Sequence, residues 1–306
     1  MAQFLVLIIS FVTGLLCQKN KSFPKSTGHS LNLFIIYVSL PALILVKVPR
    51  MISDLDLNGD WWIPVSMMWF AFFLAVFLVF VIGKAKKWPA PTMGALMLTV
   101  GLGNTSFVGF PILEALIGPE AIPVGILADQ PGSFLLVSTL GIVIASSFSG
   151  EKVSVKTILR RLFTFPPFLT IIFSLFWSLL GVPGKGIVTG AMTPIAATLV
   201  PLALFAVGFQ TKVNWEVLIR RRSAIGIGLL LKLFLIPLVC WLLYWKALGK
   251  ENFYTQVSLL EAAMATQITS AVVAAEFDVD PELAQLMVTL SVPLSLITVP
   301  LWHFWL

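Results

Sequence analysis

Residues 101–118 read GLGNTSFVGFPILEALIG and lie inside a long apolar run that predicts a membrane-spanning helix. Gly101, Gly103 and Gly109 loosen a helix, and Pro111 removes a backbone donor and clashes with the preceding turn. We therefore expect one helical half to end near Gly103 and a second half to begin at Pro111, because proline suits the first position of a helix. The alternative is one helix with a proline kink, in which the small residues only allow close packing.

The polar residues Asn104, Thr105 and Ser106 favour the interrupted helix, because a kink requires none of them. Backbone freed at membrane depth is tolerated only where it is buried in protein or lines a wet cavity. A half-helix that begins at Pro111 directs N–H groups and its positive dipole end toward the middle of the membrane, where they attract an anion. The sequence therefore predicts a carboxylate ligand and, on this span, the binding residues Asn104, Thr105, Ser106, Gly109 and Pro111.

The amino-acid composition predicts an integral membrane protein. Of its 306 residues, 58% are hydrophobic and 11% are charged, against about 45–50% and about 25% in soluble domains. A helix needs about 20 apolar residues to cross a bilayer, so the length allows about ten spans and little else. The apolar runs place these ten helices at 3–17, 31–49, 61–83, 92–117, 121–148, 166–180, 187–209, 223–245, 253–277 and 282–305.

The positive charges predict how the chain crosses the membrane. Most of the 20 lysines and arginines fall in alternate loops, which the positive-inside rule assigns to the cytoplasm, so both termini are expected outside. Most of these basic residues lie in loops beside the bilayer, so the net charge of +6 does not indicate a nucleic-acid partner. The basic loops contain Lys19, Lys21 and Lys25; Lys84, Lys86 and Lys87; Lys152, Lys156, Arg160 and Arg161; and Lys212, Arg220, Arg221 and Arg222.

The chain also repeats itself. The sequence around Pro41 is similar to that around Pro201, and Gly118-Pro119-Glu120 is similar to Asp280-Pro281-Glu282, at nearly the same separation. Since five spans are an odd number, the second copy enters the membrane in the opposite direction. This pattern predicts inverted five-helix repeats, as in many secondary transporters, at 1–149 and 166–306 with a cytoplasmic connecting loop at 150–165.

The ninth span is the counterpart of the fourth in such a repeat. Its stretch MATQITSA, residues 264–271, supplies Thr266, Gln267, Thr269 and Ser270 as further binding residues. Ser and Thr can cap a helix that begins here, but there is no proline, so an intact helix and a broken one both remain open.

Three ionisable residues, Asp129, Lys232 and Glu261, fall within predicted spans. Each costs about 2.5–3.5 kcal/mol or more at the bilayer centre if it is unpaired, so each is a functional candidate. Either one carboxylate carries a coupling proton or Lys232 forms a structural ion pair with one of the acids. No enzyme motif and no clustered metal ligands are found, so we predict a non-enzyme without cofactor or metal.

The chain resembles a prokaryotic member of the auxin efflux carrier family, within the superfamily of bile-acid, arsenite and riboflavin transporters. The most specific block is GNTSFVGFP at 103–111, supported by Gly118-Pro119-Glu120-Ala121, by Asp129-Gln130 with Gly132-Ser133-Phe134, and by Pro201-Leu202-Ala203-Leu204-Phe205. The resemblance implies ten helices in inverted repeats, with helices four and nine broken and crossed. It also implies that Asn104 contacts substrate and that Pro111 is the crossover proline. Unlike many relatives, this chain lacks the ninth-helix proline.

The resulting hypothesis is a secondary transporter of a small organic anion, such as an auxin-like monocarboxylate or a malonate-like dicarboxylate. Its expected partners are that anion, H⁺ or Na⁺ as coupling ion, the bilayer of a bacterial inner membrane and, by analogy, a second copy of the chain. The alternatives are a sodium-coupled symporter of bile-acid-like amphipathic acids and a membrane scaffold or receptor that transports nothing.

Overall fold

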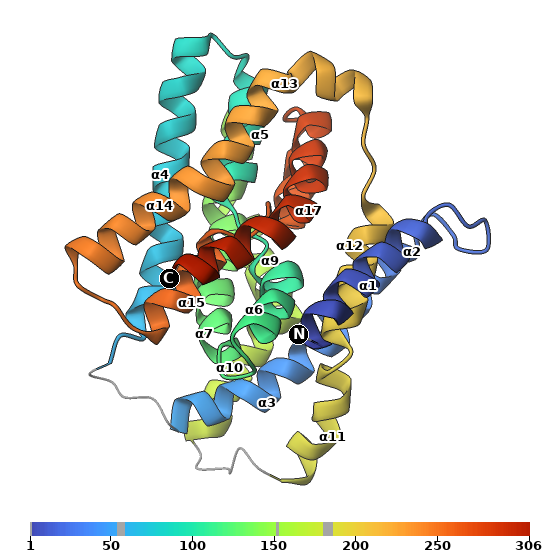
Figure 1. Ribbon diagram of the computed structural model, residues 1–306, viewed down its shortest axis with the longest axis vertical. Coiled ribbons are helices and arrows are strands. Elements are labelled where there is room, and N and C mark those ends of the chain that lie inside the picture. The colour runs from blue at the N-terminus through green and yellow to red at the C-terminus, as the bar shows by residue number, and fades with distance from the viewer. Residues whose placement is uncertain (1, 54–58, 151–152, 180–185) are drawn as a thin grey trace. The chain divides into compact units, whose positions relative to one another are not determined.

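The computed structural model describes residues 2–53, 59–150, 153–179 and 186–306 (Figure 1). Within these ranges the secondary structure is helical apart from one isolated β-bridge. Residues 151–152 of the predicted connecting loop, which include Lys152, lie outside the described residues, as does residue 180 at the end of the predicted span 166–180.

Many of the helices are joined end to end through π-helical turns, labelled η. In the first half of the chain the elements are α1 (Ala2–Cys17), α2 (Thr27–Phe34), η1 (Ile35–Ser39), α3 (Leu40–Ser53), α4 (Trp62–Lys86), α5 (Ala90–Gly101), η2 (Thr105–Gly109), α6 (Phe110–Leu116), α7 (Ile122–Ala128), η3 (Asp129–Phe134), η4 (Val137–Gly141) and α8 (Ile142–Ser149). In the second half they are α9 (Val155–Thr164), α10 (Pro166–Leu179), α11 (Ile187–Ala196), α12 (Leu199–Gln210), α13 (Trp215–Leu230), η5 (Leu231–Leu235), α14 (Ile236–Cys240), η6 (Trp241–Ala247), α15 (Phe253–Ala262), α16 (Ile268–Glu276) and α17 (Pro281–Trp305).

Six helical stretches of the described chain are long and apolar enough to cross a membrane by themselves. A seventh is added if α9 and α10, which are bent by 66° at their junction, form one span. The predicted spans 92–117 and 253–277 do not count among them, because each is interrupted and its halves are too short to cross alone. The six stretches are Thr27–Pro49, Trp62–Lys86, Ile122–Ser149, Ile187–Gln210, Trp215–Ala247 and Pro281–Trp305.

The helices form two compact units, and each unit combines segments from both halves of the sequence. Unit 1 comprises Met1–Trp61, Ser106–Ile126 and Arg160–Thr211, and unit 2 comprises Trp62–Thr105, Leu127–Leu159 and Lys212–Leu306. Each compact unit therefore contains segments from both predicted sequence repeats, and neither unit corresponds to one repeat.

In unit 1, α1 lies along α12 at very short range. A Cβ atom on Gly14 would overlap the Phe205 carbonyl oxygen, and one on Gly208 would overlap the Phe11 carbonyl oxygen. Only glycine permits such an approach of two helix backbones. The Gln18 amide then donates to the carbonyls of Phe209 (2.6 Å) and Thr211 (3.0 Å) and so satisfies the end of α12.

The second main pairing of unit 1 joins α3 to α10 and α11. The hydroxyl groups of Ser39 and Thr198 are hydrogen-bonded at 2.7 Å. The Lys47 ammonium donates to the Pro119 carbonyl at 3.1 Å, which connects α3 to the turn after α6.

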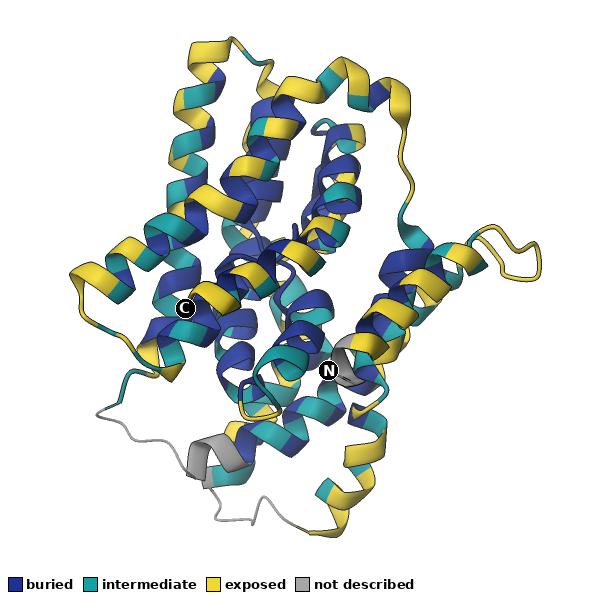
Figure 2. Cartoon of the chain, viewed as in Figure 1, coloured by how far each residue is buried: buried dark blue, intermediate teal, exposed yellow. Residues whose placement is uncertain are grey.

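Unit 2 is built around α5, which contacts α4, α8, α13, α16 and α17. Every residue of α5 from Thr92 to Val100 is buried, so the helix has no face toward solvent or lipid (Figure 2). A helix that is apolar on all sides belongs in the interior of a bundle. The chain therefore reaches Gly101, where α5 ends, from the interior of this unit.

The fourth span is interrupted, as the sequence predicts, but Pro111 is not the start of its second half. The chain leaves α5 at Gly101, is extended at Leu102, and resumes as a helix at Thr105. Pro111 lies farther along, after the π-helical turn η2. A π-helical turn is wider than an α-helical turn, so it can accommodate the proline ring and its missing N–H without ending the helix.

The ninth span is also interrupted, although it has no proline. Helix α15 ends at Ala262 and α16 begins at Ile268 after the extended residue Gln267. The sequence left open whether this helix is intact or broken, and the structure shows that it is broken. The break has a tertiary cause, because the freed backbone pairs with another segment of unit 2.

Replacing Gly14 or Gly208 by alanine is expected to destabilise the protein, because each added methyl group would force α1 and α12 apart. The expected cost is about 1–3 kcal/mol, measured as a lower midpoint of thermal unfolding in detergent. Gly226→Ala on α13 is the matched control, because nothing lies within 4 Å of a Cβ built there. Equal effects in all three variants would contradict the close approach of α1 and α12.

Candidate functional site

The two interruptions of unit 2 pair with each other through their backbones. Gly103 and Thr266 form an antiparallel β-bridge. The Asn104 N–H donates to the Ala265 carbonyl at 2.7 Å, and the Gln267 N–H donates to the Leu102 carbonyl at 3.0 Å. We refer to residues 102–105 and 262–267 as the crossover. Its bridge satisfies backbone groups that the two broken helices leave without helical partners.

Side chains reinforce the crossover from both sides. The Thr266 hydroxyl donates to the Thr99 carbonyl in the last turn of α5 at 2.8 Å. The Thr266 N–H donates to the Ser291 hydroxyl oxygen on α17 at 2.9 Å. Sequence reasoning missed Thr99 and Ser291, because an isolated Ser or Thr in an apolar helix gives no signal of a distant partner.

The predicted polar residues of unit 2 lie at or next to the crossover, but not all are enclosed. Asn104, Thr105, Thr266, Gln267 and Ser270 are buried, whereas Thr269 is exposed on α16. The Ser270 hydroxyl donates to the Gln267 carbonyl at 2.6 Å, so it closes the first turn of α16.

The remaining three predicted binding residues, Ser106, Gly109 and Pro111, belong to unit 1. Gly109 and Pro111 are buried within η2 and α6, and Ser106 is partly exposed. They follow the crossover directly in the chain, because the second half of the fourth span begins at Thr105.

Asp129 is fixed next to the crossover by two hydrogen bonds. The Thr105 hydroxyl donates to one carboxylate oxygen at 2.5 Å, and the Gln130 amide donates to the other at 2.7 Å. The carboxylate lies on the π-helical turn η3, which the Trp69 indole N–H of α4 holds by donating to the Pro131 carbonyl at 2.9 Å. Thr105 is therefore a partner of Asp129 in this structure.

Lys232 and Glu261 complete the group of buried charges. The Lys232 side chain is buried on η5, and its ammonium donates to the Ala262 carbonyl at 3.5 Å. The Trp302 indole N–H holds this turn by donating to the Leu233 carbonyl at 2.9 Å. Glu261, on the last turn of α15, is fully buried, and its carboxylate oxygens have no hydrogen-bond partner among the described residues.

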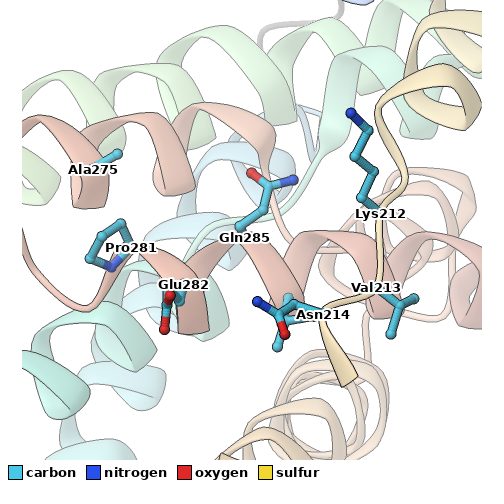
Figure 3. Close-up of a pocket in the computed structure, with 8 residues that line it drawn as sticks. Lys212, Val213, Asn214, Ala275, Pro281, Glu282 and Gln285 are labelled. Carbon is cyan, nitrogen blue, oxygen red and sulfur yellow. The ribbon is translucent and has the colours of Figure 1, made fainter. Parts of the chain in front are cut away.

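A cavity of about 460 Å³ lies elsewhere in unit 2, beside the start of α17 (Figure 3). It contains none of the residues that the sequence predicted for the site. Its lining is mostly apolar surface with a few exposed polar side chains, from Lys212, Val213, Asn214, Ala275, Pro281, Glu282, Gln285 and Leu286.

Ser291→Ala is expected to destabilise the crossover, because the buried Thr266 N–H loses its acceptor. A buried donor left without a partner costs about 1–3 kcal/mol. The matched control is Ser295→Ala on the same helix, since the equally buried Ser295 hydroxyl donates to the Val292 carbonyl of its own turn. Thermal unfolding in detergent measures both, and a Ser291→Ala midpoint no lower than that of Ser295→Ala would contradict the assigned role.

Comparison with known proteins shows the family of the chain. A family model described as a membrane transport protein matches residues 1–303. An uncharacterized transporter of Methanothermobacter thermautotrophicus is 28% identical over 282 residues, which cover 90% of this chain and 88% of the relative. An uncharacterized transporter of Methanocaldococcus jannaschii is 22% identical over 309 residues, covering 97% and 96%. The chain therefore belongs to the membrane transport protein family, the auxin efflux carrier family that its sequence resembles.

Proposed function

We propose that this membrane transport protein is a secondary carrier of a small organic anion that binds at the crossover. The observation that carries the proposal is the pairing of two interrupted helices beside buried polar side chains. In a membrane, irregular backbone persists only where protein or a wet cavity satisfies it. Substrate sites of secondary transporters commonly lie at such interruptions.

The contacts within unit 1 support ten spans in two inverted repeats. Helix α1 pairs with α12, and α3 pairs with α10. In the predicted repeat these are the first span with the seventh and the second span with the sixth. In two inverted repeats a pseudo-two-fold axis would exchange one pairing for the other. The interruptions of the fourth and ninth spans are related in the same way.

The anion is proposed to be a mono- or dicarboxylate of the auxin-like or malonate-like kind. The Asn104 amide provides both donors and an acceptor, and Gln267 provides a second buried amide at the start of α16. Helix N-termini favour a carboxylate, and here the two second halves begin at Thr105 and Ile268. Thr269 and Ser270 of unit 2, and Ser106, Gly109 and Pro111, which follow Thr105 in the chain, remain proposed binding residues.

Transport is proposed to proceed by alternating access, with unit 1 and unit 2 moving against each other. Each unit has its own internal packing, which is the requirement for movement as a body. The distribution of basic loops supports an orientation in a plasma membrane with both termini outside the cytoplasm. Coupling to H⁺ or Na⁺ and assembly as a homodimer belong to the same hypothesis.

Asn104→Ala is expected to lower anion flux roughly 10- to 100-fold. This is the effect expected when a charged ligand loses one or two hydrogen bonds. The measurement is substrate-dependent current in proteoliposomes challenged with mono- and dicarboxylates, with and without a pH or sodium gradient. Thr298→Val is the matched control, because it alters a buried polar side chain of unit 2 on α17 outside the crossover.

Three other outcomes would change the assignment. Current that requires sodium and responds to amphipathic acids would favour the bile-acid-like symporter. Equal flux in Asn104→Ala and the control would remove Asn104 from the site. Absence of current and of labelled-anion uptake, with folded protein, would favour a scaffold or receptor that transports nothing.

A further inference from the structure

The helix α9 has an apolar side that the described part of the chain leaves uncovered. Val155, Leu159 and Phe163 are each four residues apart, so their side chains lie on one side of the helix. Their exposed fractions are 71%, 48% and 57%. We refer to these three side chains as the apolar row of α9. Exposed apolar side chains that adjoin one another in this way indicate a surface that another component covers.

The rest of α9 is basic. Lys156 and Arg160 are exposed and border the apolar row, and Arg161 lies on the opposite side of the helix. The helix contains no aspartate or glutamate. It is continuous where unit 2 ends in the sequence at Leu159 and unit 1 resumes, so its two sides follow from its own helical period. A helix with an apolar row and a basic opposite side is typical of segments that lie in a membrane surface.

The junction with α10 supports a position at the membrane surface. The two helices are bent by 66° at Phe165, because the residue before Pro166 is disfavoured in a helix. The 10 residues of α9 extend about 15 Å, which is about half of the hydrocarbon core. Its basic side chains would be costly inside that core. The helix therefore suits the surface of the membrane and not a spanning position.

The apolar surface continues from α9 into α10, which favours lipid over a soluble partner as the component that covers it. The rings of Phe163 and Phe168 are in edge contact, with their centroids 6.2 Å apart. Beyond them, Leu169, Phe173 and Phe176 of α10 are exposed at helical spacing. The sequence places α10 in a membrane span, so its exposed row faces acyl chains. Lipid covers both rows, whereas a soluble partner would cover only the first.

We propose that α9 is a docking surface for the anionic phospholipids of the cytoplasmic leaflet. The apolar row enters the boundary between headgroups and acyl chains, while the Lys156 ammonium and the Arg160 guanidinium bind lipid phosphates. The basic loops predict that this segment is cytoplasmic. The negative charge of that leaflet complements the charge of the helix. The contact anchors the segment that connects the two predicted repeats, and it does not depend on which solute the protein carries.

The test is amide hydrogen–deuterium exchange of the full-length protein in nanodiscs. One set contains phosphatidylcholine alone, and the other contains phosphatidylcholine with phosphatidylglycerol. Anionic lipid is expected to slow exchange in α9 by about fivefold or more, which is the effect of one basic side chain near an anionic surface. The buried helix α5 is the internal reference and should exchange equally in both sets. Equal exchange of α9 in both sets would refute the proposal.

A pair of charge variants tests the basic residues. Lys156→Gln with Arg160→Gln is expected to abolish the difference between the two membranes, because the apolar row remains but the charge complementarity is lost. The matched control is Lys84→Gln with Lys86→Gln, which removes two exposed lysines at the end of α4 and should keep the difference. A lipid effect that survives in the first variant, or that is lost equally in the control, would overturn the assignment to α9.

An apolar variant tests the row itself. Leu159→Ser with Phe163→Ser is expected to speed exchange of α9 in both membranes, because the helix then leaves the lipid surface. Unchanged exchange would show that the row does not enter the membrane, and the proposal would fail. The changed side chains are exposed, so the fold should persist, and unchanged exchange of α5 verifies it. None of these readouts requires transport, so they are independent of the proposed function.

Discussion

The structure of unit 2 depends on one constraint, which is that a backbone N–H or C=O group inside a membrane must have a partner. Breaking two helices at mid-span frees several such groups at once. The bridge between Gly103 and Thr266 lets each break satisfy backbone groups of the other, and the hydroxyls of Thr266 and Ser291 provide two further bonds. Neither interruption would be tolerated alone, so the two broken helices form a single structural feature.

The same enclosed region holds the three buried charges, and their placement follows from local departures from α-helical geometry. Asp129 and Lys232 each lie on a π-helical turn, η3 and η5. In both turns a tryptophan indole N–H bonds to a backbone carbonyl, from Trp69 in one case and Trp302 in the other. Such turns often occur at functional sites. In this protein the two π-helical turns determine where the Asp129 and Lys232 side chains lie relative to the crossover.

Unit 1 has a different character, because its packing depends on small residues. Gly14 and Gly208 bring the backbones of α1 and α12 together, and a hydroxyl pair joins Ser39 to Thr198. Lipid is as apolar as the side chains it would replace, so association between membrane helices relies on close contact and hydrogen bonds. A unit packed in this way is held together by its own internal contacts.

The sequence by itself determined the membrane class, the family, most span positions and the interruption of the fourth span. These features are encoded locally, in runs of apolar residues and in the block of glycines, polar residues and proline from 101 to 111. Only the tertiary structure decided that the ninth span is broken without a proline and that the second half of the fourth span begins at Thr105 and not at Pro111. It also decided that Ser291 and Thr99 bond to the crossover. The physical reason is that a break in a membrane helix is stable only when a distant segment accepts its backbone groups, and no local pattern names that segment.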